Sequence, residues 1–257
     1  MDYKLKSKYL KDFIKEITFR NRNPRDLKAL ELLDDISTNP ERIIYTGSKL
    51  YRCRIIKDNS LISNSAPFYG YNAVDSFVPP VNATRDMRAN YRYIPYLYAS
   101  NNPYIALVEV RPRFGASVSI AMISVNEDLR FLDFTNANKP SKMTDAKVNL
   151  FSDLSALYSK PVTDDDDIID YIPTQYIAEY AKNLGYDGII FKSSIVPEIN
   201  ETNLDRYNVV VFNFDKCQVI KSNVLKVTRH YIDCEQTDAD SEQINIESYI
   251  SELLGSL

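Results

Sequence analysis

Segments with helical spacing of apolar residues and segments with strand-like alternation follow one another in this chain without a regular order. Apolar residues recur at helical spacing from Tyr3 to Ile17 and from Tyr171 to Leu184, whereas Lys49 to Ile56 and Ser117 to Val125 alternate as strands do. A sheet of parallel strands would need a helix after almost every strand. The pattern therefore predicts an α+β fold.

At 257 residues the chain is long enough for one sizeable core with a small appendage. The appendage is predicted to be helical and to occupy residues 1–46, with a second helix that begins at Asn23 and Pro24 and runs to about Ile36. Residues 47–233 would form the main domain. An acidic linker and a last amphipathic helix are predicted for residues 234–257.

The segment from Ile94 to Glu109 contains an acid in an otherwise apolar run. Ile94 to Ala99 is predicted to be a strand, and Asn102 followed by Pro103 predicts the start of a short helix that ends at Glu109. Carboxylates are seldom buried without a partner or a task. Glu109 is therefore the first candidate for a catalytic residue.

Further strands are predicted at residues 129–134, 187–191, 207–214 and 223–232, and a further helix at residues 142–158. Residues 57–84 are rich in Asn, Ser and Pro and are predicted to form an irregular loop, and long loops are often functional. Four adjacent acids at residues 164–167 lack the glycine and the ligand spacing of a calcium loop, so a solvated loop is the preferred interpretation.

The cysteine and histidine content argues against several kinds of site. Cys53, Cys217 and Cys234 lie far apart with no CxxC spacing, and His230 is the only histidine. A disulfide framework, a zinc site and a Ser-His or Cys-His relay are therefore not expected, and no metal is predicted.

The chain is predicted to be cytoplasmic. It shows no basic segment followed by an apolar stretch at its start, and no apolar run near the roughly 20 residues needed to cross a bilayer. The net charge of -4 gives no general reason to bind nucleic acid. Neither a membrane nor a nucleic acid is therefore an expected partner.

Recognition of a phosphate group by this chain would have to rely on side chains. The sequence contains neither GxGxxG nor the P-loop pattern, so the two commonest backbone cradles for nucleotide phosphates are missing. Guanidinium groups match the geometry of phosphate oxygens. The candidates are Arg52, Arg54, Arg85, Arg88 and Arg92.

Four sequence blocks resemble the RES domain, a family named for its Arg, Glu and Ser. They occur in the family's order and span about Leu50 to Val227. The blocks are LYRCR at Leu50 to Arg54, RANYRYIPYLYAS with ALVEVRP between Arg88 and Pro112, YIPTQYIAEYAKNLGYDGIIFKSS at Tyr171 to Ser194, and NVVVF at Asn208 to Phe212. The N-terminal helices also resemble an extension found in longer members of the family.

The resemblance implies a fold similar to ADP-ribosyltransferases, with a mixed sheet core, peripheral helices and the helical N-terminal appendage. It also implies a pocket for NAD+ as substrate, in which the bond between nicotinamide and ribose is broken. Breaking this bond develops positive charge on the ribose, so a nearby carboxylate should accelerate the reaction. Glu109 matches the family's acid.

The same blocks imply which residues bind NAD+. Arg52 and Arg88 match the family's arginines and would hold the dinucleotide phosphates. Tyr98 would stack on nicotinamide or pack beside it. Asn208, in the NVVVF block, is also expected to bind NAD+.

Ser193 matches the serine of the family and would donate a hydrogen bond to ribose or to phosphate. The adjacent Ser194 is the alternative, because the sequence does not decide which hydroxyl faces the pocket. Glu109, Arg52 and Ser193 are the predicted catalytic residues.

The leading interpretation is an NAD+-degrading enzyme, working by phosphorolysis as the bacterial toxin of a toxin–antitoxin or defence system. The alternatives are a mono-ADP-ribosyltransferase that modifies a protein and a nucleotide-binding module without turnover. An antitoxin and a second copy of the chain are the candidate protein partners. An acceptor phosphate would need a further cation, for which Arg85 and Arg92 are candidates.

This chain departs from the family's pattern at two places. Arg92 and Tyr93 stand where a Pro- or Gly-containing stretch is usual, and Lys192 stands where a Pro is frequent before the serine. Both departures are expected to alter the shape of the pocket or the access of the acceptor.

Overall fold

The computed structural model describes residues 5–24, 26–135, 139–160, 168–193 and 206–229. The chain divides into two compact units, Met1–Val227 and Thr228–Leu257. Only Thr228 and Arg229 are described in the second unit, so the fold described below is that of the first. The acidic run at residues 164–167, the C-terminal linker and helix, His230, Cys234 and Ser194 lie outside the described residues.

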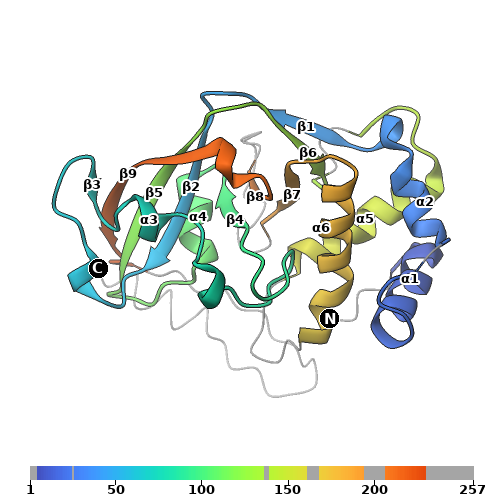
Figure 1. The fold of residues 1–257 in the computed structure, drawn as a ribbon, viewed down its shortest axis with the longest axis horizontal. Coiled ribbons are helices and arrows are strands. Elements are labelled where there is room, and N and C mark those ends of the chain that lie inside the picture. Colours follow the sequence, from blue (N-terminus) through green and yellow to red (C-terminus); the bar gives the residue numbers. More distant parts are fainter. Residues whose placement is uncertain (1–4, 25, 136–138, 161–167, 194–205, 230–257) are drawn as a thin grey trace, which may run out of the picture. The chain divides into compact units, whose positions relative to one another are not determined.

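The described part of the first unit contains a mixed sheet of nine strands in the order β1-β6-β7-β8-β4-β2-β5-β9-β3 (Figure 1). Only the β6–β7 and β3–β9 pairs are parallel among them. The strands are β1 (Glu41–Ile44), β2 (Lys49–Ile55), β3 (Phe68–Tyr69), β4 (Leu97–Ser100), β5 (Ser117–Val125), β6 (Leu129–Asp133), β7 (Gly188–Lys192), β8 (Tyr207–Val211) and β9 (Cys217–Lys226).

The helices do not alternate regularly with the strands, so the prediction of an α+β fold is confirmed. Figure 1 shows α1, α2, α5 and α6 gathered at one end of the unit, with β2, β5, β9 and β3 at the other. The α-helices are α1 (Lys8–Phe19), α2 (Lys28–Asp34), α3 (Ala73–Ser76), α4 (Pro103–Glu109), α5 (Asp145–Ser159) and α6 (Ile172–Asn183).

The pairing between the neighbouring strands β2 and β4 is very short. These antiparallel strands share one residue pair, Tyr51 opposite Ser100, whereas β2 and β5 pair along the whole of Lys49–Ile55. β2 and β4 therefore separate on one side of that pair. The helix α4 packs beside these two strands, where its Ala106 is buried with Cys53 of β2 and Val118 of β5.

The helices α1, α5 and α6 pack on the same face of the sheet to which the side chain of Ser100 points. Ser100 lies opposite Asn208, and Asn208 lies opposite Phe191, so these side chains point to the same side. Ile189 and Val210 continue this face and are buried against α1, α5 and α6. The opposite face forms a second core cluster, with Leu97, Ala99, Val209, Val211 and Ile190 among its members.

The first 46 residues belong to this compact unit and are not helical throughout. β1 pairs with β6 as an edge strand, and Leu10, Phe13 and Ile17 of α1 are fully buried in the same core as α5 and α6. Ser7 caps α1 by accepting a hydrogen bond from Leu10 N, and its own backbone N donates to Asp153 Oδ2 of α5 at 2.7 Å. The domain boundaries at 46 and 233 remain predictions.

The two Asn-Pro signals have different outcomes. Asn102 accepts hydrogen bonds from the backbone N–H of Tyr104 and Ile105 and Pro103 starts α4, so this predicted helix is confirmed up to Glu109. Asn23 and Pro24 do not start the second helix. α2 begins at Lys28 with no side-chain cap, and the backbone N of Asn23 instead donates to Asn21 Oδ1 in a local turn.

The predicted strands over residues 49–56, 117–125, 129–134 and 187–191 correspond to β2, β5, β6 and β7, and the predicted helices over 142–158 and 171–184 correspond to α5 and α6. The segment 57–84 is mostly irregular but contains α3 and the short strand β3. The strand predicted over residues 223–232 corresponds to β9, which starts earlier, at Cys217, ends at Lys226 and pairs with β5 along most of its length.

Candidate active site

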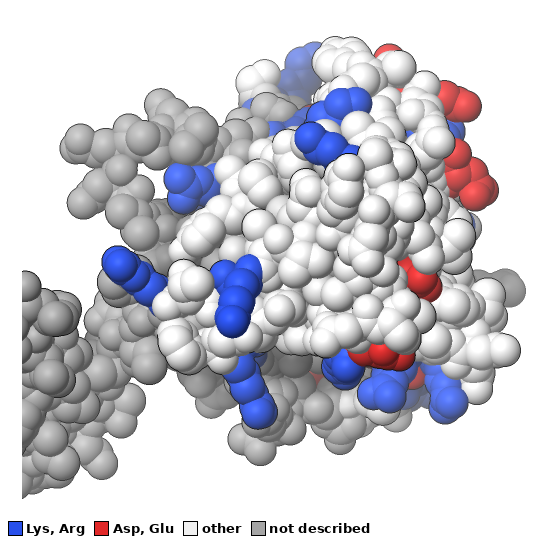
Figure 2. All heavy atoms as spheres, turned by 90° about the vertical axis from the view of Figure 1, so that its left-hand side faces the viewer, with Lys and Arg blue, Asp and Glu red and all other residues white. Residues whose placement is uncertain are grey.

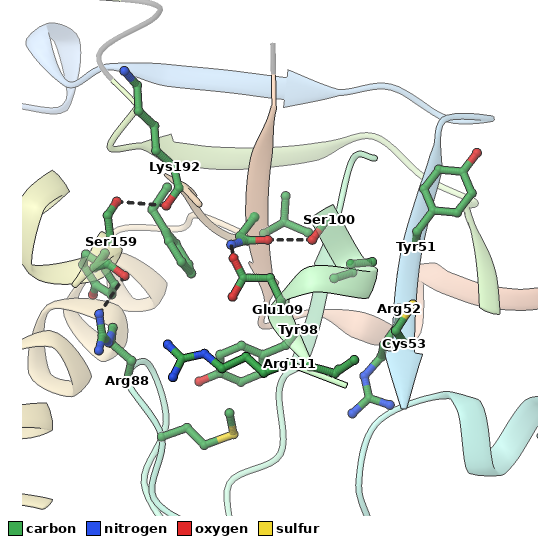
Figure 3. Close-up of a pocket in the computed structure, with 18 of the residues that line it drawn as sticks. Tyr51, Arg52, Cys53, Arg88, Tyr98, Ser100, Glu109, Arg111, Ser159 and Lys192 are labelled. Atoms are coloured by element: carbon green, nitrogen blue, oxygen red, sulfur yellow. Dashed lines mark hydrogen bonds between the residues drawn. The ribbon is translucent and has the colours of Figure 1, made fainter. Parts of the chain in front are cut away.

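A cavity of about 500 Å³ lies where β2 and β4 separate. Its floor comes from one face of the sheet, with Tyr98 and Ser100 of β4, Asn208 of β8 and Phe191 of β7. Figure 3 shows these strands with β2 at one side and the end of α5 at the other. The volume falls in the range of about 300 to 1,000 Å³ that is usual for small-molecule sites.

Two helices wall the cavity. α4 contributes Ala106 and Glu109 on the side of β2, and the end of α5 contributes Tyr158 and Ser159 on the other side. The Ser159 hydroxyl donates to the carbonyl oxygen of Lys192 at 2.9 Å, which joins the end of α5 to the end of β7. Both walls are therefore tied to the sheet.

Glu109 is the last residue of α4, and its carboxylate is fixed by two donors. Oε1 accepts from Ser193 Oγ at 2.6 Å and from Asn208 Nδ2 at 2.7 Å. Asn208 is itself oriented, because its Oδ1 accepts from Ser100 Oγ at 2.6 Å. Figure 3 shows the second oxygen of Glu109 on the cavity side. A negative charge is thus presented to the cavity in one orientation.

Tyr98 contributes its ring rather than its hydroxyl. The hydroxyl donates to Asn90 Oδ1 at 2.8 Å and accepts from Ala89 N at 3.1 Å. Burial raises the pKa of this phenol well above its ordinary value. Tyr98 is therefore a neutral, rigidly held aromatic surface in the cavity wall.

Arg52 brings a partly desolvated cation to the cavity. Its Nη1 donates to Ser76 O at 3.2 Å, and the neighbouring Arg54 donates to Phe77 O at 3.1 Å. Burial, reinforced by the charge of Arg54, lowers the pKa of Arg52 to about 9. An anion bound here would offset the cost of keeping this guanidinium charged.

Arg88 lines the cavity from the other side, and much of its hydrogen bonding is structural. Its Nη1 donates to the carbonyl oxygens of Leu157 at 2.9 Å, Tyr158 at 3.0 Å and Lys160. These carbonyls lie at the C-terminal end of α5, where a cation also interacts favourably with the helix dipole. Arg88 therefore caps the C-terminal end of α5, beside the cavity, by binding its backbone carbonyl oxygens.

The RES domain family model matches residues 49–231. This chain belongs to the RES domain family. A comparison with curated proteins found no match. Among solved structures, the chain is similar to one in the M. tuberculosis MbcT–MbcA toxin–antitoxin complex, with 15% sequence identity, 77% of this chain and 92% of the other chain covered, and a TM-score of 0.44.

The cavity of this RES domain brings together the residues that the sequence singled out. Glu109, Ser193 and Asn208 are joined by hydrogen bonds, and Arg52 and Tyr98 line the same cavity. Ser193 is the serine hydroxyl in contact with Glu109. Their roles in binding and catalysis remain predictions.

The candidate cations for an acceptor phosphate, Arg85 and Arg92, do not line the cavity. Both are exposed, and the Arg92 guanidinium lies 4.8 Å from the centre of the Tyr93 ring. The cations that do line it besides Arg52 and Arg88 are Arg111, Lys160 and Lys192. A signal for one of them was present in the sequence, since Arg111 follows Glu109 by two positions within the VEVRP block.

The described part of this RES domain offers no group of three or more His, Cys, Asp or Glu side chains suited to a metal ion. It also has no helix long and apolar enough to span a membrane. Figure 2 shows the side of the unit that carries β3 and β9, where Lys and Arg are spread around a broad uncharged area. The described residues of this face form no continuous basic stripe of the kind that attracts nucleic acid.

Proposed function

We propose that this RES domain cleaves the bond between nicotinamide and ribose in NAD+, with inorganic phosphate as the acceptor. The observation that carries the proposal is the carboxylate of Glu109, held by Ser193 and Asn208 and directed into the cavity. A fixed negative charge in a partly closed site stabilises positive charge that develops during a reaction. The carboxylate is thereby suited to glycosidic bond cleavage.

The reaction balances without a cofactor other than the substrate itself. The bonding pair between the ribose carbon and the pyridinium nitrogen moves to that nitrogen, so nicotinamide leaves as a neutral base. The ribose carbon gains positive charge, and the carboxylate of Glu109 in the cavity wall stabilises this charge. A phosphate oxygen then forms a bond to this carbon, and the products are nicotinamide and ADP-ribose phosphate.

The other residues would position the dinucleotide. The ring of Tyr98 offers a flat neutral surface for nicotinamide, since its hydroxyl is occupied by Asn90 and Ala89. Arg52 is the favoured partner of the diphosphate, because its desolvated charge gains most from an anion. Arg88 would act mainly by holding the end of α5 in place.

The test is release of nicotinamide from NAD+ by the purified chain, with and without inorganic phosphate. Glu109→Gln is the matched variant, because the amide oxygen can still accept from Ser193 and Asn208 while the charge is removed. We expect phosphate-dependent release by the wild type and a loss of about 100-fold or more in the variant. Equal release with and without phosphate would assign the acceptor role to water instead.

We further propose that the enzyme acts as a bacterial toxin restrained by an antitoxin, as its family membership suggests. Induced expression in bacteria should lower cellular NAD+ and arrest growth, and Glu109→Gln or Arg52→Ala should relieve the arrest. Growth arrest with unchanged NAD+ would point to modification of a protein target.

A further inference from the structure

Arg111 has a backbone conformation that its residue type disfavours. Its φ is +44°, in the left-handed region that glycine adopts readily and arginine seldom does. Pro112 follows it, and a residue before proline is restricted further. Glycine would fit this position without strain, so the presence of arginine needs a reason other than the turn itself.

Burial of the side chain does not supply that reason. The Arg111 side chain is exposed, whereas Pro112 beside it is buried. The other described non-glycine residues with positive φ are Asp26 and Tyr93, and neither lines the cavity. Strain that persists in a cavity wall is more often linked to binding or catalysis than strain elsewhere.

The left-handed turn directs the Arg111 side chain into the site. The residue follows α4 directly after Val110, and its backbone N donates to Val108 O at 2.9 Å. Figure 3 shows the side chain extending across the cavity, below Glu109 and in front of Tyr98 in this view, with its guanidinium on the side of Arg88. A cation thereby lines the same cavity as the carboxylate that is proposed to face the ribose.

We propose that Arg111 binds a phosphate group of the reaction beside Glu109, either the attacking phosphate or the diphosphate of NAD+. This inference rests on the proposed function. A guanidinium can bind phosphate with two parallel hydrogen bonds, which fixes orientation as well as charge. Arg52, Arg88 and Arg111 line the same cavity, so Arg111 would add a third guanidinium to the cations around the substrate.

The experiment compares Arg111→Gly with the wild type in steady-state nicotinamide release and in thermal unfolding. Arg111→Gly should raise Tm, because the strained φ is relieved, and should raise KM about tenfold or more for one of the two substrates. Arg111→Lys should show a smaller rise in KM, since the charge is kept and the paired hydrogen bonds are lost. Asp26→Gly is the matched control, since Asp26 also has a positive φ and does not line the cavity, and it should show a raised Tm with both KM values unchanged.

The two sources of phosphate are separated by which KM changes. A rise for inorganic phosphate alone assigns Arg111 to the acceptor, and a rise for NAD+ alone assigns it to the diphosphate. Unchanged KM values for both in Arg111→Gly would overturn the inference while leaving the proposed function intact.

If the wild type releases no nicotinamide at all, the proposed function fails and binding tests Arg111 independently. Calorimetric titration with pyrophosphate would then be compared between the wild type and Arg111→Gly. Binding weakened about tenfold supports a phosphate site at Arg111, and equal affinity or no binding overturns it.

Discussion

The hydroxyl of Ser193 lies 2.6 Å from Oε1 of Glu109, although the two residues are 84 positions apart in the chain. The amide of Asn208 donates to the same oxygen at 2.7 Å. Because Glu109 ends α4, Ser193 directly follows β7 and Asn208 lies in β8, the orientation of the carboxylate depends on how three elements meet at the cavity.

Removing one donor to Glu109 should weaken turnover without unfolding the chain. Ser193→Ala and Asn208→Ala should each lower kcat/KM for NAD+ by about 10- to 100-fold, because the carboxylate loses its fixed orientation. Thr46→Ala is the control, since this hydroxyl donates to Asp128 Oδ1 and does not line the cavity. It should change the rate by no more than about a factor of two. A rate unchanged in Ser193→Ala and Asn208→Ala would contradict this role.

Arg88→Met should lower the free energy of unfolding by about 2 to 4 kcal/mol, because three carbonyl oxygens at the end of α5 lose their charged donor. Urea unfolding monitored by circular dichroism measures this loss. Arg92→Met should stay within about 0.5 kcal/mol of the wild type, since Arg92 is exposed. Equal stability of the two variants would remove the structural role assigned to Arg88.

Gly188 in β7 occupies a position where only glycine fits. A Cβ there would collide with Val210 O and the ring of Phe131. Gly188→Ala should therefore cost about 3 kcal/mol or more, or prevent folding. At Gly47 a Cβ meets nothing and only the φ of +88° is unfavourable, so Gly47→Ala should cost about 1 to 2 kcal/mol. Similar Tm losses in the two variants would contradict the tight packing of β7.

Stability should fall at alkaline pH because of the buried thiol of Cys217. Burial raises its pKa to about 12 from the ordinary 9.0, so the unfolded chain loses this proton above pH 9 while the folded chain keeps it. Fewer protons bound in the unfolded state means that the free energy of unfolding decreases as pH rises, by about 1.4 kcal/mol per pH unit for one group.

The contribution of this thiol is isolated by comparing the pH dependence of stability in the wild type and in Cys217→Ala as the pH rises from below 9.0 toward about 12, its two pKa values. This comparison is needed because Lys147 acts in the opposite direction, its pKa being lowered to about 8 by burial. The pH dependence should be shallower in Cys217→Ala, and identical slopes would show that the thiol contributes nothing.

The elements that could be predicted from sequence are those with local signals. Asn102 and Pro103 fixed the start of α4, and alternation fixed β2 and β5, because caps and burial patterns act within a few residues. β1 was missed because a short edge strand depends on its partner β6, which lies far along the chain. The start of α2 was misplaced because Asn-Pro is typical of both turns and helix starts, and here Asn23 takes part in a local turn with Asn21.

The site followed the same division. The motif blocks singled out Glu109, Ser193 and Asn208, and hydrogen bonds join these three residues in the structure. The contacts of Arg88 with α5 could not be predicted, because they join segments far apart in the chain. Arg88 and Leu157 are separated by 69 positions. The direction of Arg111 likewise depends on an unusual backbone angle that sequence patterns do not reveal.

The most direct measurement is identification of the products formed when the purified chain is incubated with NAD+ and inorganic phosphate, by chromatography and mass spectrometry. The account predicts nicotinamide and ADP-ribose phosphate in equal amounts with the wild type, and neither above background with Glu109→Gln. Intact NAD+ after incubation with the wild type, or the same products at the same rate with Glu109→Gln, would contradict it.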